Sequence, residues 1–148
     1  MANAKTTRND NSSRFGKFIE VQFNAAGYIS GAVISVYLLE KSRTVQLAKD
    51  ERTFHIFYQL LEGASKELAA KLHLGKPSDF RYLAQSGTTT VPGVSDKAEF
   101  AVTKDALDTY QIDADDQEAI FRVIAGVLHL GNLEFKGEKA TITNQKQL

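Results

Sequence analysis

Two neighbouring apolar runs, separated by a short polar turn, are the feature that most constrains the fold of this chain. In the first run, residues 15–23, alternate positions carry large apolar side chains: Phe15, Ile19, Val21 and Phe23. The second run, residues 28–39, is apolar on both faces and rich in β-branched residues. Asn24 and Gly27 stand at the ends of the intervening turn, where a type I turn favours them. The pattern predicts an antiparallel β-hairpin with a well-buried second strand, in which Gly31 indicates a β-bulge or a close backbone approach.

A segment crowded with hydrogen-bonding side chains leads into the first strand. This segment, TRNDNSSRFGK, residues 7–17, is called the polar loop below. Its adjacent serine hydroxyls can divide two tasks, since one can ligate Mg²⁺ while the other hydrogen-bonds a phosphate oxygen or a water. The amides of Asn9 and Asn11 can donate to phosphate, and Arg14 can clamp a carboxylate. Turn geometry alone also favours Asn, Asp and Ser, so composition leaves a phosphate site and an ordinary turn both open.

The remainder of the chain carries mostly helical signals. Residues 40–52 are charged and predict a short helix or connector. Residues 53–74 have apolar side chains at helical spacing, and Gly63 predicts a break into two helices. Residues 76–94 lack such periodicity and predict a loop.

Two further helices are indicated towards the end of the chain. Asp96 and Glu99 have the spacing of a capping box at the start of the first one. The second begins with an acidic turn, residues 113–117, and ends at Gly131 as the C-cap. Its apolar stripe is formed by Ile120, Val123, Ile124, Val127 and Leu128. Residues 133–135 then predict a short strand.

Several charged and titratable residues invite a functional interpretation but are explained more simply. Glu51 and Arg52 could form a salt bridge at a hinge, but such pairs are usually solvated, so we expect both at the surface. His55, His73 and His129 are too scattered for an obvious metal triad. We expect these histidines to pack or to make local hydrogen bonds.

Composition excludes several broad classes. Eighteen basic and eighteen acidic residues give a formal net charge of zero, which argues against a general attraction to nucleic acid or membranes. Cysteine is absent, so neither a disulfide framework nor a thiolate zinc site can form. No apolar stretch approaches the roughly 20 residues of a transmembrane helix. The start of the chain lacks an apolar signal region, so the expected setting is the cytosol.

Five sequence blocks resemble one known family. The block NAKTTRNDNSSRFGKF, residues 3–18, closely resembles switch I of the myosin motor domain. Four more blocks resemble myosin head sequence in the same order: YLLEKSR (37–43), DERTFHIFYQLL (50–61), YLAQSG (82–87) and VLHLGNLEF (127–135). The resemblance covers essentially the whole chain and implies a fragment running from switch I through part of the upper 50-kDa region. A further stretch, QLAKDERTFH (46–55), leans towards conventional, class II myosin.

The resemblance implies roles for five residues of the polar loop in binding ATP and Mg²⁺. Asn9 would lie near the nucleotide phosphates, with Asn11 as a second nucleotide-binding residue. Ser12 would contact the γ-phosphate and orient the attacking water, and Ser13 would be a ligand of Mg²⁺. Arg14 would pair with a glutamate of switch II when the site closes. Ser12 and Arg14 are therefore the candidate catalytic residues of a phosphoryl transfer to water.

The fold class implied is an α+β fragment of the P-loop NTPase motor fold, with a β-hairpin from the central mixed sheet and several packed helices. The layout expected within this partial motor domain, residues 1–148, has four parts. They are a switch I loop (3–17), a β-hairpin (15–39), a helical upper 50-kDa segment (40–132), and a short strand with a polar tail (133–148).

The chain also departs from the complete motor. It contains neither the phosphate-binding motif GxxxxGK[ST] nor the DxxG of switch II. We therefore expect the isolated chain to be inactive, with strand faces left partly uncovered and marginal stability. The complete parent would be an actin-activated ATPase of the actin cytoskeleton, with F-actin and light chains as partners.

Two alternatives remain open from the sequence. The first is a non-catalytic interaction module derived from a motor head, which the missing motifs support. The second is a fragment of a kinesin-type microtubule motor, whose switch I also carries N-x-x-S-S-R. That arginine is followed by Ser-His in kinesins, whereas Phe15, Gly16 and Lys17 follow it here.

Overall fold

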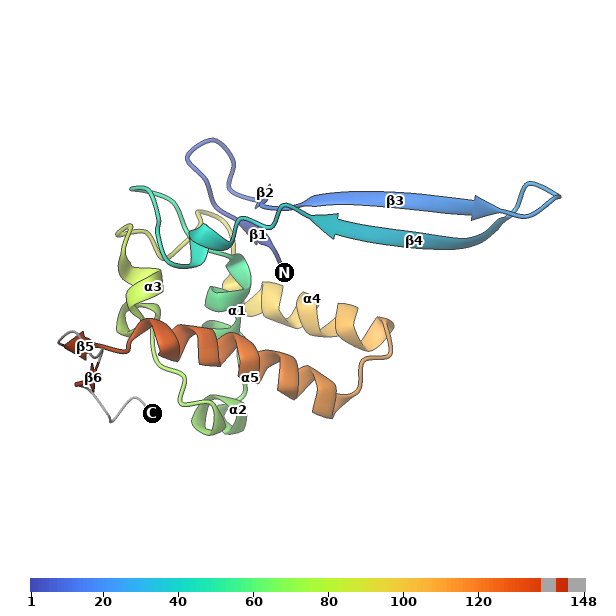
Figure 1. Ribbon diagram of the computed structural model, residues 1–148. Helices are drawn as coiled ribbons and strands as arrows, with labels where there is room; N and C mark the ends of the chain where they lie inside the picture. Colours follow the sequence, from blue (N-terminus) through green and yellow to red (C-terminus); the bar gives the residue numbers. More distant parts are fainter. Residues whose placement is uncertain (137–140, 144–148) are drawn as a thin grey trace.

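A long β-hairpin projects from a cluster of helices in the computed structural model, which describes residues 1–136 and 141–143 (Figure 1). The strands are β1 (Asn3–Ala4), β2 (Ser12–Ser13), β3 (Gly16–Phe23), β4 (Ile29–Tyr37), β5 (Phe135–Lys136) and β6 (Thr141–Ile142). The α-helices are α1 (His55–Gly63), α2 (Lys66–Lys71), α3 (Arg81–Ala84), α4 (Asp96–Thr109) and α5 (Ala114–Gly131). Two 3₁₀ turns, η1 (Lys41–Thr44) and η2 (Pro77–Asp79), lie in the connections.

The projecting hairpin is formed by β3 and β4, which confirms the predicted antiparallel pair. The register shifts between Gln22 and Phe23, beside the pairing of Gln22 with Gly31, so the predicted bulge is present. At the tip, the Gly27 amide donates to the Asn24 carbonyl at 2.9 Å. Gly27 has a φ of +83°, a conformation that glycine adopts without strain.

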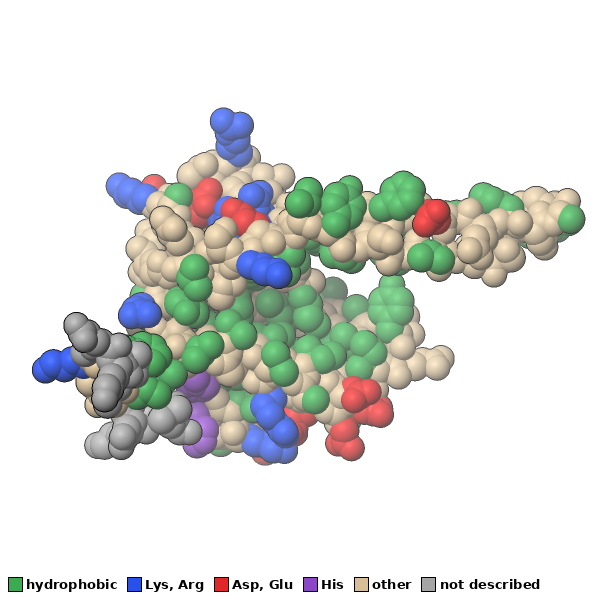
Figure 2. Space-filling model, viewed as in Figure 1, with side chains coloured by type: hydrophobic (Ala, Val, Ile, Leu, Met, Phe, Trp, Pro, Cys, Tyr) green, Lys and Arg blue, Asp and Glu red, His purple; other side chains and the backbone are tan. Residues whose placement is uncertain are grey.

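Apolar side chains stay exposed along both strands of this hairpin, as Figure 2 shows for the face in view. Ile34, in the middle of β4, is 58% exposed. The expectation of a well-buried second strand is therefore wrong for this chain, while that of partly uncovered strand faces is confirmed. The physical reason is that a strand pair alone cannot cover its own faces, and among the described residues the helices pack mainly on one another.

The helices enclose a core centred on α1, which packs mainly against α4. The rings of Phe100 on α4 and Phe121 on α5 lie 5.0 Å apart between their centroids. A side chain at Gly63 would collide with Phe100, since a Cβ there would lie 2.4 Å from the Phe100 Cβ. As predicted, Gly63 ends one helix, and the next starts at Lys66 after the capping residue Ser65.

The prediction of a loop over residues 76–94 is wrong in part, because η2 and α3 lie within it. These elements are only three and four residues long, too short to display a helical period. Phe80 and Leu83 anchor them in the core.

Helix α4 begins where predicted but is capped by a different residue. The Ser95 hydroxyl accepts a hydrogen bond from the Ala98 amide at 3.3 Å, so Asp96 is not the cap. The Asp96 carboxylate binds a buried arginine instead, as described below. The predicted acidic start of α5 is confirmed, with the Asp113 carboxylate accepting from the Asp116 amide at 2.9 Å.

The apolar stripe predicted for α5 is correct in part: Leu128 is buried, and Ile124 and Val127 are half-buried against the core. The buried residues of this helix are Gln117, Phe121, Ala125, Leu128 and Gly131. Val123, a member of the predicted stripe, is 69% exposed. Gly131 is the last helical residue and Asn132 is the C-cap. Gly131 is needed for close packing, because a Cβ there would lie 2.5 Å from the Tyr82 ring.

The last described strands pair antiparallel, with Phe135 opposite Ile142. The short strand predicted at residues 133–135 begins two residues later, at Phe135. Leu133 instead packs as a buried residue. Residues 144–148 of the predicted polar tail lie outside the described residues. Within the described part of the chain, no helix is both long enough and apolar enough to cross a bilayer.

Candidate functional site

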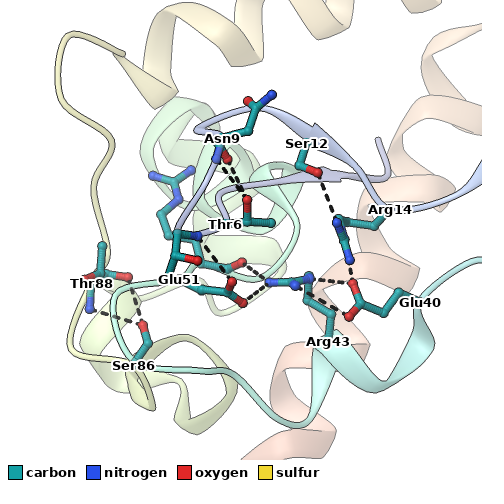
Figure 3. Close-up of polar contacts among 11 residues, drawn as sticks. Thr6, Asn9, Ser12, Arg14, Glu40, Arg43, Glu51, Ser86 and Thr88 are labelled. Carbon is teal, nitrogen blue, oxygen red and sulfur yellow. Dashed lines mark hydrogen bonds and ion pairs between the residues drawn. The ribbon is translucent and has the colours of Figure 1, made fainter.

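The polar loop lies on a small two-stranded ladder beside the helical core. Strand β1 pairs with β2, placing Asn3 opposite Ser13 and Ala4 opposite Ser12. Ala4 is completely buried and also forms a bridge with Phe54, which precedes α1. The base of the loop is therefore fixed to the core, while its tip is exposed (Figure 3).

The asparagines of the loop use their side-chain oxygens internally. The Asn9 side-chain oxygen accepts from the Asn11 amide at 2.7 Å, and the Asn11 oxygen accepts from the Asn3 side chain at 3.1 Å. Thr6 closes the turn through its hydroxyl, which accepts from the Asn9 amide at 3.1 Å. These bonds are the ordinary turn geometry that composition allowed. They also leave the NH₂ groups of Asn9 and Asn11 as donors, which is the polarity that a phosphate requires.

The two serines differ in their surroundings because successive residues of a strand point to opposite sides. Ser12 is half-buried, and its hydroxyl oxygen accepts from the Arg14 guanidinium at 3.0 Å. Ser13 is exposed, and its hydroxyl has no hydrogen-bond partner among residues 1–136 and 141–143. The structure thus brings Ser12 to Arg14 and leaves the Ser13 hydroxyl available to a ligand.

Arg14 is bound by a carboxylate from the end of the hairpin. Its Nε donates to Glu40 Oε2 at 2.6 Å, and the Glu40 amide donates to the Arg14 carbonyl at 2.9 Å. Burial raises the pKa of Glu40, but hydrogen bonds from Arg14 and Arg43 outweigh it, so the pKa of this carboxyl lies below its usual value. Glu40 is therefore an ionised partner of Arg14 at neutral pH.

A second arginine extends this network. The Arg43 side chain is only 7% exposed; its Nε donates to Glu40 Oε2 at 2.7 Å and its Nη1 to Glu51 Oε2 at 2.8 Å. Glu51 Oε1 accepts from the Thr7 amide at 3.3 Å. Sequence reasoning missed Glu40 and Arg43, and it expected Glu51, whose side chain is only 14% exposed, at the surface. The sequence shows that the connector is rich in charge, but it does not show partners as distant as Thr7 and Glu51, which are 44 residues apart.

Arg52 lies in the core, so the prediction that it is solvated is wrong. The side chain is 0% exposed, and its two terminal nitrogens each donate to the Asp96 carboxylate at 2.8 Å. One of them also donates to the Thr89 carbonyl at 3.1 Å. The guanidinium carbon lies 3.9 Å from the centre of the Tyr58 ring. A buried arginine tolerates loss of water only with partners of this kind.

Two of the three histidines, His55 and His129, make hydrogen bonds as predicted, whereas His73 is exposed. Arg52 Nη2 lies 3.1 Å from His55 Nδ1, which must accept because an arginine stays protonated. The His55 ring also hydrogen-bonds the backbone of Asp10 in the polar loop. Burial, with the nearby Arg52 charge, lowers the pKa of His55. His129 Nε2 lies 2.9 Å from the Leu72 carbonyl.

No group of three or more His, Cys, Asp or Glu side chains suited to a metal ion occurs within the described ranges. A metal at the polar loop would therefore need other ligands than a cluster of carboxylates and histidines from the described ranges. The Ser13 hydroxyl oxygen, which has no partner among the described residues, fits Mg²⁺, because this ion prefers hard oxygen ligands and retains several waters or phosphate oxygens.

Comparison with known proteins gives one consistent result. Residues 1–148 match the family model of the myosin head (motor domain). The chain is 54% identical over 134 residues to the myosin-I heavy chain of Dictyostelium discoideum, covering 90% of this chain and 6% of that protein. It is 50% identical over 145 residues to myosin-7 of Arabidopsis thaliana, covering 97% of this chain and 8% of that protein.

A third relative is the non-muscle myosin heavy chain of Drosophila melanogaster, 50% identical over 137 residues, covering 93% of this chain and 7% of that protein. This chain thus spans less than a tenth of the length of these relatives. Their identities to it differ by only a few per cent. Assignment to class II therefore stays a prediction.

Proposed function

This chain belongs to the myosin head (motor domain) family, and we propose that it is a segment of an actin-based, ATP-driven motor. The family match over all 148 residues carries the proposal. It favours a myosin over the kinesin alternative. The P-loop NTPase motor fold, F-actin and light chains as partners, and a place in the actin cytoskeleton all belong to the proposed parent protein.

Within that motor, we assign the polar loop to switch I, which senses the γ-phosphate of Mg-ATP. Ser13 is the proposed Mg²⁺ ligand, supported by its exposed hydroxyl, which has no partner in the described part of the chain. Asn9 and Asn11 are the proposed donors to the nucleotide, supported by the internal bonding of their side-chain oxygens. The bound metal would neutralise charge on the phosphates during transfer.

Ser12 and Arg14 are the proposed catalytic residues. Because the Ser12 oxygen accepts from Arg14, its own proton is directed elsewhere and can be donated to a phosphate oxygen or used to hold the attacking water. Arg14 is held through Nε by Glu40, so the outer edge of its guanidinium can meet a second carboxylate. In the proposed motor, that carboxylate belongs to switch II, which this chain lacks.

The isolated chain is proposed to be inactive. It has one of three elements that a phosphate-transferring motor requires and lacks the Gly-rich phosphate cradle and the DxxG motif. The test is a turnover assay of the purified 148-residue polypeptide with ATP, with and without magnesium. Magnesium-dependent hydrolysis by this polypeptide alone would overturn the proposal.

The role of the loop is tested in a complete motor. Residues 1–148 are placed into the matching segment of the Dictyostelium myosin-I heavy chain head, and turnover of Mg-ATP is measured. Ser13→Ala is expected to lower kcat by roughly 10²-fold, the effect of removing one well-placed charge-stabilising group. Ser78→Ala, an exposed serine on η2, is the matched control and should leave kcat unchanged.

The interaction-module alternative predicts a different outcome. In that case the unsubstituted chimera folds and binds actin but does not hydrolyse ATP. If instead the chimera turns over and Ser13→Ala behaves like Ser78→Ala, the metal role assigned to Ser13 is wrong.

A further inference from the structure

One buried guanidinium is connected to both ends of the segment from Thr7 to Arg14. Figure 3 shows Arg43 between the carboxylates of Glu51 and Glu40. Each of these carboxylates binds a different end of the segment. Arg43 itself comes from η1, in the connection between β4 and α1.

On the Arg14 side, one oxygen is shared. Glu40 Oε2 accepts from Arg43 Nε at 2.7 Å and from Arg14 Nε at 2.6 Å. Any displacement of Arg43 therefore changes the acceptor that orients Arg14. Arg14 in turn donates to the Ser12 hydroxyl at 3.0 Å, so the link extends to the serines of the loop.

On the Thr7 side, one carboxylate bridges a side chain and the backbone. Glu51 Oε2 accepts from Arg43 Nη1 at 2.8 Å, and Glu51 Oε1 accepts from the Thr7 amide at 3.3 Å. A guanidinium has five donors in a rigid planar fork, so it can hold two carboxylates at once. Arg43 uses this capacity while 7% exposed, where a second partner cannot be replaced easily by water.

We propose that Arg43 is a positioning residue of the nucleotide site, clamping both ends of the segment from Thr7 to Arg14 through Glu51 and Glu40. Its effect on catalysis rests on the function proposed above, whereas the clamp itself rests on the contacts. It fixes the approach of Arg14 to a second carboxylate, and it connects the loop to the end of β4. Movement of the hairpin would thereby reach the loop.

The clamp is tested first by hydrogen exchange at the Thr7 amide in the 148-residue chain. Arg43→Met should make this amide exchange at least about tenfold faster, because Glu51 loses the partner that holds it. Amides of α4 and α5 should keep their rates, which separates release of the loop from global unfolding. Arg122→Met, an exposed arginine paired with Glu118 on α5, is the matched control and should leave Thr7 unchanged.

A second variant covers the case in which Arg43→Met does not fold. Glu40→Gln acts on the Arg14 side, and among the described residues Glu40 makes no hydrogen bond with Thr7 or Glu51. Arg14→Met releases the same end of the segment but leaves the Glu40–Arg43 contact in place, so exchange at Thr7 that is faster in Glu40→Gln than in Arg14→Met requires transmission through Arg43. Thr7 exchange no faster in either Arg43→Met or Glu40→Gln than in Arg122→Met overturns the clamp.

The catalytic consequence is measured in the chimeric motor. Arg43→Met should lower kcat by about tenfold or more, while KM for ATP changes less than about threefold, because a misplaced group affects the transition state more than binding. An unchanged kcat would remove the positioning role. If Ser13→Ala lowers kcat and Arg43→Met does not, switch I stands and the positioning role of Arg43 fails. If Thr7 exchange responds and Ser13→Ala has no effect, the clamp stands and the proposed function fails.

Discussion

Arg52 and Asp96, 44 residues apart in the sequence, are joined by two hydrogen bonds of 2.8 Å that fix the start of α4 to the segment before α1. The guanidinium is completely buried, and the carboxylate nearly so. Removing the charge of one member leaves the other buried without an opposite charge.

Asp96→Asn is therefore expected to be strongly destabilising. The free energy of unfolding should fall by about 3–5 kcal/mol, the usual effect of breaking a buried ion pair from one side. Urea denaturation, monitored by circular dichroism, measures this free energy of unfolding. Glu118→Gln, which breaks an exposed pair with Lys71 and Arg122, is the control and should have a much smaller effect. Equal effects of the two substitutions would show that the buried pair has no special importance.

Acid should weaken the fold through His55. Burial and Arg52 lower its pKa in the folded chain, and this outweighs the Asp96 and Asp10 carboxylates and the Asp10 backbone, which act to raise it. The unfolded chain therefore takes up the proton first, and the unfolding free energy falls as pH drops below about 6.5. Denaturation at pH 7.5 and pH 5.5 measures this slope, which His55→Gln should flatten. A slope unchanged by His55→Gln would assign the acid sensitivity to other groups.

Two glycine substitutions should change stability in opposite directions. Gly63→Ala places a Cβ against Phe100, and such overpacking costs typically about 1–3 kcal/mol. Gly126→Ala, within α5, meets no atom within 4 Å and should stabilise the chain by roughly 0.5–1 kcal/mol. Thermal unfolding of both variants gives the comparison. A destabilising Gly126→Ala or a neutral Gly63→Ala would contradict the packing described.

The exposed hairpin should make the chain prone to self-association. Ile34→Lys and Val36→Lys, both on β4, should increase the soluble monomer fraction in light scattering and size-exclusion chromatography. Their effect on unfolding should stay within about 0.5 kcal/mol, as for most surface changes. Val123→Lys, equally apolar and exposed but on α5, is the control. A soluble monomer that melts cooperatively at high temperature without these changes would contradict the prediction.

Much of the local structure could be predicted from the sequence. The hairpin, the turn at Asn24 and Gly27, the break at Gly63 and the acidic start of α5 all depend on residues within a few positions of one another. The prediction was wrong where a residue's burial depends on how elements pack together. The exposed position of Val123 depends on which side of α5 meets α1 and α4, and no period within α5 specifies that.

The candidate site divides in the same way. The sequence by itself determined the loop, its two serines and the family, because these depend on residue types in a fixed local order. Only the tertiary structure decided that Glu40 holds Arg14, that Arg43 connects Glu40 to Glu51, and that Arg52 is buried with Asp96. The physical reason is that the residues next to an arginine in the sequence do not specify which distant carboxylate it will pair with. An arginine is solvated or buried according to which carboxylates the fold brings within 3 Å of it.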